Sequence, residues 1–268
     1  MTRLTRLIRL TPCIALLAFG CLYDTGELYT QGPIGPPTAE ADPPPFATGV
    51  PIDPILALRF DRHLDPFAVY PSAAVRLSSG RRQVELEVSW DPVDRAVYAI
   101  PTKRLTPGVR YVFEVVDPDL LPDLTGRTLD ADAVEALRTP FTVDEEGVER
   151  SIPTDGIDLT DPEAAFRRYV VGGPGACAGC HTAGALYPNT DLALDDLDEV
   201  KRRQAKTSPE RKLVVAGQPA RSYLLHKLLF DYPDIGGEPM PLGIDMSDSD
   251  RRNALRATQA WIQSLSGL

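Results

Sequence analysis

Three segments between residues 50 and 143 alternate apolar and polar side chains with a period of two, and this pattern constrains the fold most strongly. The apolar positions are Leu56, Leu58 and Phe60; Val84, Leu86, Val88 and Trp90; and Val109, Tyr111, Phe113 and Val115. Each set is typical of a strand with one face buried and the other in water. Turn-forming pairs such as Ser79-Gly80 and Asp91-Pro92 separate the segments. We therefore predict an antiparallel β-sandwich.

Residues 47–143 resemble an S-layer-type bacterial Ig-like domain. The resemblance rests on residues 47–51 leading into Leu58-Arg59-Phe60, on residues 105–111, on Asp123-Leu124-Thr125-Gly126 and on Arg138-Thr139-Pro140-Phe141. It implies that Tyr111 is a corner tyrosine, whose hydroxyl binds an upstream backbone group. We also predict that His63, beside Arg62, lies at the surface.

The most specific chemical signal is the pentapeptide Cys177-Ala178-Gly179-Cys180-His181. Two thiols three positions apart can add to the two vinyl groups of a haem, and the histidine that follows can become an iron ligand. A zinc site would need four ligands, and His63 and His226 stand in no ligand-like spacing. A thioredoxin-like pair would follow a strand, whereas Gly-rich residues 172–175 precede this motif. We predict one covalently attached haem c.

The second axial iron ligand is predicted to be Met240. This methionine stands between Pro239 and Pro241 in a loop without helical or strand periodicity. Proline restricts the backbone and thereby the direction in which the thioether can point. Met246 and His226 are the rivals for the same position.

Residues 160–268 resemble the class I cytochrome c fold. The resemblance rests on the order of a helix that Thr160 would cap, the Cys177–His181 motif, further helices, the Met240 loop and a final helix that contains Trp261. It implies that Cys177 and Cys180 are thioether anchors, with His181 as the proximal and Met240 as the distal ligand. The fold class predicted for the whole chain is two-domain: an all-β Ig-like antiparallel sandwich followed by an all-α cytochrome c fold.

The first residues predict export. Arg3, Arg6 and Arg9 precede the short apolar stretch 13–19, so residues 1–20 are typical of a signal peptide. Residues 17–21 resemble the lipobox of bacterial lipoproteins, which implies that Cys21 becomes the lipidated first residue. A plain signal peptide with an incidental cysteine is the alternative.

The predicted organisation continues with a Pro-rich tether at 21–46, which has the composition of an extended linker. The Ig-like domain occupies residues 47–143, a polar linker residues 144–159 and the haem domain residues 160–268. Leu22 after the lipid cysteine resembles lipoproteins that are sent to an outer membrane. We therefore expect a membrane-anchored lipoprotein in the periplasm or at the cell surface, in the outer membrane.

The charge of the chain excludes one class of partner. Its formal net charge is −10, and residues 22–160 hold 12 basic and 24 acidic residues. Nucleic-acid binding requires a basic face, so no nucleic-acid partner is predicted.

These observations predict a membrane-tethered c-type cytochrome that performs one-electron transfer with redox partner proteins. Iron held by both His181 and Met240 has no open position, and no acid–base pair stands beside the motif, so an electron carrier is favoured over a stand-alone catalyst. Two alternatives remain. One is a surface interaction lipoprotein with an accessory haem, and the other is a haem-based sensor of a small molecule.

Overall fold

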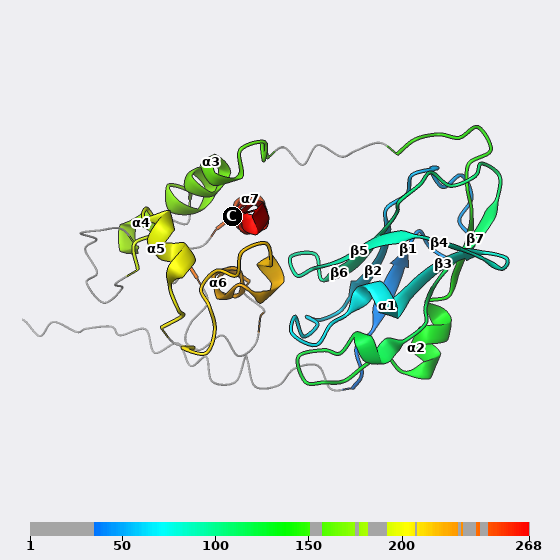
Figure 1. Ribbon diagram of the computed structural model, residues 1–268, viewed down its shortest axis with the longest axis horizontal. Coiled ribbons are helices and arrows are strands. Elements are labelled where there is room, and N and C mark those ends of the chain that lie inside the picture. Colours follow the sequence, from blue (N-terminus) through cyan, green and yellow to red (C-terminus); the bar gives the residue numbers. More distant parts are fainter. Residues whose placement is uncertain are drawn as a thin grey trace, which may run out of the picture.

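Two separate hydrophobic clusters organise the chain, one in a β-sandwich and one in the C-terminal part. The computed structural model describes residues 35–150, 157–174, 177–181, 192–206, 208–229, 232, 240–241 and 246–267. Figure 1 shows the strands gathered on the right and helices α3 to α7 on the left. The predicted signal peptide, Cys21 and most of the predicted tether lie outside the described residues.

The sandwich consists of two four-stranded antiparallel sheets, ordered β1-β2-β6-β5 and β4-β3-β7-β8. The strands are β1 (Ala39–Asp42), β2 (Leu56–Phe60), β3 (Val75–Ser79), β4 (Arg82–Val84), β5 (Leu86–Asp91), β6 (Ala96–Pro101), β7 (Arg110–Val115) and β8 (Thr139–Thr142). Short helices α1 (Pro71–Ala74), η1 (Pro118–Leu120) and α2 (Ala131–Ala136) lie between strands. The predicted antiparallel β-sandwich is confirmed.

The alternating residues behave as the period-two pattern predicts in β7 but not in every strand. Tyr111, Phe113 and Val115 are buried in β7, and Val112 and Glu114 between them are more exposed. In β2 the small residue Ala57 is buried as well as Leu56 and Leu58. This strand pairs on both sides, with β1 and β6, so its backbone is internal to the sheet.

Tyr111 occupies the predicted corner position. The backbone N–H of Thr106 donates a hydrogen bond to the Tyr111 hydroxyl, with 3.1 Å between nitrogen and oxygen. The turn between them reverses at Gly108, whose φ of 66° is costly for residues with a side chain. The predicted tie between Tyr111 and an upstream backbone group is thus confirmed.

The C-terminal part contains mostly short helices. They are α3 (Pro162–Phe166), which continues as the π-helical turn η2 (Arg167–Val171), α4 (Cys177–Cys180), α5 (Leu197–Arg202), η3 (Pro219–Arg221), α6 (Tyr223–Leu228), α7 (Asp248–Ser264) and η4 (Leu265–Gly267). The cap of α3 is Asp161, one residue after the predicted Thr160, because the Asp161 carboxylate accepts from the Ala164 N–H. No helix in the described ranges is both long and apolar enough to cross a membrane.

The all-α cytochrome c fold predicted for residues 160–268 is wrong. Apart from the 17 residues of α7, the α-helices described in this part have four to six residues and are joined by irregular segments. Gly172 and Gly173 end the first helical segment, and a Cβ atom at Gly173 would collide with the Tyr169 carbonyl. The apolar residues that suggested long helices instead pack together in one hydrophobic cluster.

That cluster joins the ends of this part through a ring contact. Phe166 of α3 stacks on Trp261 of α7 with ring centroids 4.3 Å apart, and both rings are fully buried. Around them lie the other buried members: Val170, Leu194, Leu197, Val200, Ala205, Leu213, Val214, Tyr223, Leu224, Leu225, Leu228, Leu229, Tyr232, Met246, Ala254, Leu255, Ile262 and Leu265. We call this set the C-terminal cluster.

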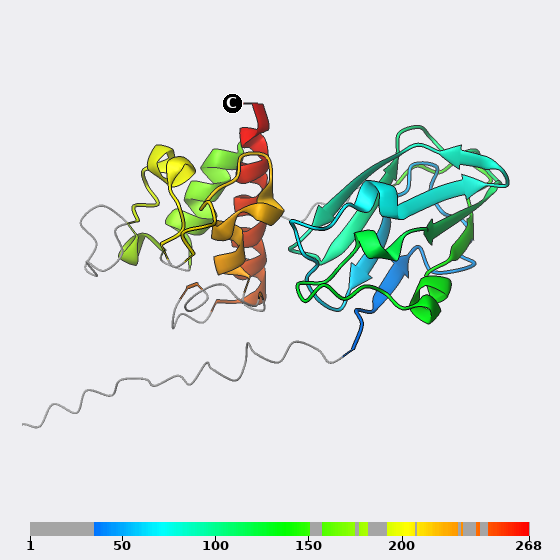
Figure 2. The same cartoon turned by 60° about the horizontal axis from the view of Figure 1, so that its bottom comes forward.

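Polar contacts hold α7 against the sandwich. Figure 2 shows α7, in red, along the side of the C-terminal part that is turned to the strands. Arg256 of α7 forms ion pairs with Asp91, at 2.7 Å, and with Asp94, in the turn between β5 and β6. Burial acts to raise the pKa of Asp94, but the Tyr98 hydroxyl and the Arg256 charge outweigh it and lower that pKa.

Substituting Arg256 with methionine is expected to lower the free energy of unfolding by about 1–3 kcal/mol, because two partly buried carboxylates lose their cation. Chemical denaturation measures this loss. Arg76→Met is the control, since Arg76 is 42% exposed in its pair with Glu114 and should cost less than about 1 kcal/mol. Equal losses in the two variants would contradict the prediction.

Candidate functional site

The predicted haem-attachment residues lie on a single turn. Cys177 and Cys180 are the first and last residues of α4, and the His181 N–H donates to the Cys177 carbonyl over 2.8 Å. Residues three apart on a helix share a face, so both thiols project toward one side. Both cysteines are partly exposed. The turn therefore presents two thiols and an imidazole within five consecutive residues.

Burial sets the protonation states of this turn. It raises the pKa of the Cys177 thiol, which stays neutral at pH 7. It lowers the pKa of the His181 imidazole, while the backbone of Leu192 acts in the opposite direction. A neutral imidazole is the form that binds a metal. The buried His181 Nδ1 makes no hydrogen bond within the described chain, whereas the ring itself is held by a hydrogen bond with the Leu192 backbone.

Cys177 and Met240 contact the same apolar core. Both side chains are partly buried and pack against the C-terminal cluster, as does Leu192. The structure thus brings one predicted thioether anchor and the predicted distal ligand to one cluster, although 62 residues separate them in the sequence.

A backbone hydrogen bond holds Met240. Its N–H donates to the Lys227 carbonyl of α6 over 2.7 Å. This contact ties the methionine loop to a helix whose other residues are largely buried. Met246, the first rival, is itself a buried member of the C-terminal cluster and is 7% exposed.

His226, the second rival, is a packed residue with an engaged ring nitrogen. It is 1% exposed, and its Nε2 lies 2.8 Å from the Ala220 carbonyl oxygen, so Nε2 carries the proton and donates. Its ring stacks on Tyr232 with centroids 4.0 Å apart. Burial lowers the pKa of His226 to about 4. Binding iron through Nε2 would require this hydrogen bond to break.

The predicted surface position of His63 is wrong. The predicted surface residue is 4% exposed, and its ring lies 4.9 Å from that of Tyr232. A residue of the sandwich is therefore covered by a residue of the C-terminal part. No periodicity around either residue indicated this contact, because it joins two positions 169 residues apart in the sequence.

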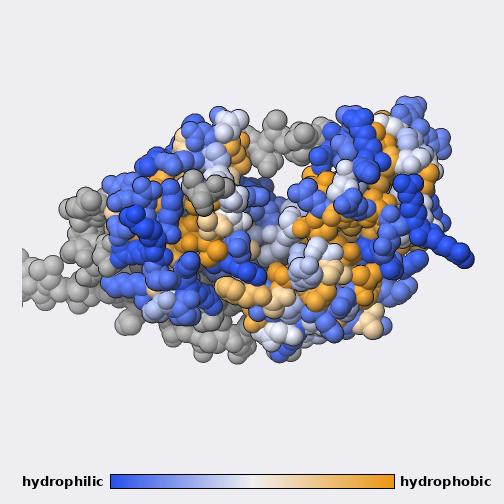
Figure 3. All heavy atoms as spheres, in the orientation of Figure 1, coloured by the Kyte–Doolittle hydropathy of each residue, from blue (hydrophilic) through white to orange (hydrophobic). Residues whose placement is uncertain are grey.

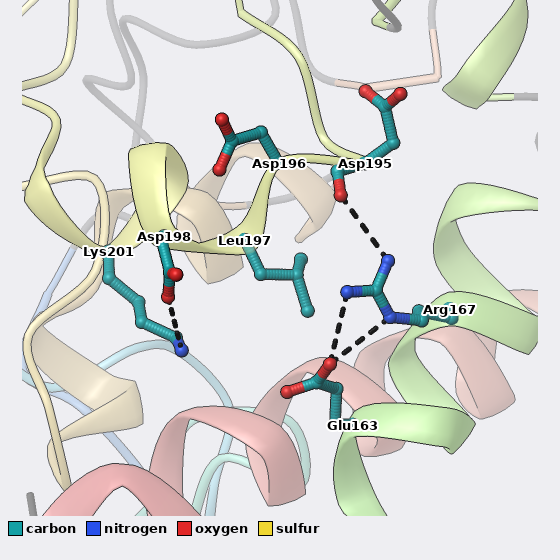
Figure 4. Close-up of a pocket in the computed structure, with 7 residues that line it drawn as sticks. All are labelled: Glu163, Arg167, Asp195, Asp196, Leu197, Asp198 and Lys201. Carbon is teal, nitrogen blue, oxygen red and sulfur yellow. Dashed lines mark hydrogen bonds and ion pairs between the residues drawn. The ribbon is translucent and has the colours of Figure 1, made fainter.

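A surface hollow of about 460 Å³ lies between α3 and α5, but it contains none of the motif residues. It is lined by Glu163, Arg167, Asp195, Asp196, Leu197, Asp198 and Lys201. Figure 4 shows two ion pairs within it, Arg167 with Glu163 and Lys201 with Asp198. Within the described ranges, no three His, Cys, Asp or Glu side chains gather into a metal-binding group.

Comparison with known proteins finds weak similarities of structure only. No family model and no curated protein matches the chain. Matching structures include the bacterial S-layer protein SbsC, at 12% identity over 41% of this chain and 14% of that chain, with a TM-score of 0.30. CopC from Methylosinus trichosporium OB3b matches at 16% identity over 44% of this chain and 99% of its own, with a TM-score of 0.28.

A third match is L,D-transpeptidase 1 of Mycobacterium tuberculosis, at 16% identity over 40% of this chain and 39% of that chain, with a TM-score of 0.26. This chain spans 14% to 24% of the length of the SbsC chains that it matches. The resemblance to S-layer proteins stated from the sequence is thus present in this weak form. No family match supports the resemblance to cytochromes c.

The buried His226 predicts acid sensitivity. Its pKa is about 4 in the folded chain and about 6.5 when unfolded, so below pH 6.5 the unfolded chain binds a proton that the folded chain does not. The free energy of unfolding should fall by about 3 kcal/mol between pH 6.5 and pH 4 from this group. His226→Phe keeps a ring against Tyr232 and should lack this part of the loss. Parallel pH profiles for the two proteins would refute the prediction.

Proposed function

We propose that this chain carries one haem c, attached covalently through Cys177 and Cys180, and transfers single electrons between redox partner proteins. The observation that carries the proposal is the turn α4, where two partly exposed cysteines stand beside a neutral imidazole and Cys177 packs on the apolar cluster that Met240 also contacts. A bound haem supplies an iron that changes oxidation state by one electron.

The residues present fit such a group. Cys177 and Cys180 have the spacing of thioether anchors, and His181 follows directly in its neutral form. The His181 ring has a hydrogen bond with the Leu192 backbone, while its buried Nδ1 has no partner among the described residues, so ligation through the nitrogen that bonds Leu192 would require that hydrogen bond to break. Apolar side chains of the C-terminal cluster, against which Cys177 and Met240 pack, would exclude water near a bound haem and would disfavour the extra charge of ferric iron.

Met240 is the favoured distal ligand. Its thioether stands at the edge of the cluster, only partly buried, whereas Met246 lies within the cluster. His226 already donates its Nε2 proton to Ala220. A histidine and methionine pair raises the reduction potential and leaves the iron without an open position, which suits an electron carrier better than a catalyst.

The proposal includes export and a lipid anchor. The basic and apolar residues 1–20 and the cysteine that follows them have the pattern of a lipoprotein signal. Cys21 would carry the lipid, with the chain anchored in the outer membrane and exposed to the periplasm or the cell surface. The prolines between residues 21 and 46 would allow the folded part to stand away from the membrane.

A second candidate function is a surface interaction protein with an accessory haem. It is favoured by large apolar side chains exposed on the sandwich, which include Phe46, at 74%, Tyr70, at 59%, and Phe67, at 57%. Figure 3 shows apolar surface, in orange, over much of the sandwich face in that view. Exposed apolar surface of this kind is common where proteins bind partners. A third candidate, the small-molecule sensor, requires displacement of Met240.

Spectroscopy of the full-length protein, expressed in a host that attaches haem c, tests the proposed function. We expect the mass of one haem on the chain and a low-spin spectrum in both oxidation states. Cys177→Ala with Cys180→Ala should abolish covalent attachment. Purification with bound zinc and no haem would overturn the proposal, and rapid binding of carbon monoxide would favour the sensor.

Substituting Met240 with alanine should remove the sulfur-to-iron charge-transfer band of the ferric protein and lower the reduction potential by on the order of 100 mV, because the axial ligand sets the potential. Met246→Ala is the matched control and should retain the band. Loss of the band in the control alone would transfer the ligand role to Met246.

Substituting Cys21 with serine should release the protein from membranes, because the acyl chains have no other attachment residue. Cell fractionation and metabolic labelling with a fatty acid measure the change. Cys13→Ser is the control, since Cys13 would leave with the signal peptide. Continued membrane association of the Cys21 variant would contradict lipid anchoring.

A further inference from the structure

Three rings connect the sandwich to the helix that holds Met240. His63, in the loop after β2, contacts Tyr232, whose ring stacks almost parallel to that of His226 in α6, at an angle of 8°. All three side chains are at most 4% exposed. The rings therefore form a continuous packed column from the sandwich to α6.

The loop after β2 also contacts η3, the short helix that precedes α6. Arg221, at the end of η3, donates from Nε to the Pro66 carbonyl over 2.9 Å, and its guanidinium lies 5.6 Å from the Phe67 ring centre. His226 donates from Nε2 to Ala220, also in η3. The segment from η3 to α6 is thus fixed both internally and against the sandwich.

Met240 is hydrogen-bonded to Lys227, the residue after His226. Its N–H donates to the carbonyl of Lys227. Packed rings and backbone hydrogen bonds therefore lead without interruption from His63 to the backbone of Met240. Interactions that share one contact network are coupled energetically, whereas distant and independent contacts are not.

We propose that His63 is a positioning residue for the distal ligand: through Tyr232 and His226, the β-sandwich holds α6 and keeps the Met240 thioether on the iron. This inference rests on the proposed function, because it concerns the ligand that Met240 supplies there. It gives the sandwich a role in the haem site instead of that of a passive spacer.

The affinity of the ferric, full-length holoprotein for cyanide tests the inference, because cyanide binds the iron only after Met240 has left it. His63→Ala removes the first ring of the column and should raise the apparent cyanide affinity by about three- to tenfold, the size expected for coupling within one network. His63→Phe restores a ring and should return the affinity to within about twofold of the unaltered protein.

Phe67→Ala is the matched control at the same interface. It removes a ring that is 57% exposed and leaves the hydrogen bond from the Arg221 side chain to the Pro66 carbonyl, so the cyanide affinity should not change. If His63→Ala does not fold, Tyr232→Leu removes the middle ring of the column and carries the same expectation. Circular dichroism and the haem content establish that each variant is folded.

The outcomes separate this inference from the proposed function. The unaltered protein can carry covalent haem and show a sulfur-to-iron band while His63→Ala binds cyanide with the same affinity as the unaltered protein. That result overturns the inference and leaves the proposed function intact. An equal rise in Phe67→Ala also overturns it, because general loosening of the interface would then suffice. Absence of covalent haem from the unaltered protein ends both.

Discussion

The C-terminal part depends on the burial of one apolar cluster. Isolated helices of four to six residues are not stable in water, because nucleation costs more than their few hydrogen bonds return. Here α4, α5 and α6 each pack apolar residues on that cluster, which the stack of Phe166 on Trp261 joins to α7. The turn with the two cysteines is held in the same way, through Cys177.

Charge and aromatic contacts join this part to the sandwich. Arg256 binds the turn between β5 and β6, and Tyr232 covers His63, so polar groups are buried on both sides of the contact. Buried ion pairs of this kind restrict geometry more reliably than they add stability. These contacts fix α7, η3 and Tyr232 against the sandwich, and the proposed role of the sandwich in the haem site depends on them.

Sequence patterns predicted the sandwich better than the C-terminal part. Alternation at Tyr111, Phe113 and Val115 reports directly which face of a strand is buried, since side chains alternate across a sheet. The leucines of α6 have helical spacing, yet the helix ends at Leu228. Periodicity over so few residues does not reveal where a helix stops, and the predicted all-α fold failed for this reason. The haem ligands remain predictions from the Cys177–His181 motif.

By itself, the sequence determined the local chemistry: the spacing of Cys177, Cys180 and His181, the alternation of the strands and the corner tyrosine, all of which depend on residues close together in the chain. Only the tertiary structure decided that His63 is buried, that Cys177 and Met240 share one cluster, and that Arg256 meets Asp91. These contacts involve residues between 63 and 169 positions apart. Such pairs form because two surfaces fit when the chain is compact, and no short-range pattern records that fit.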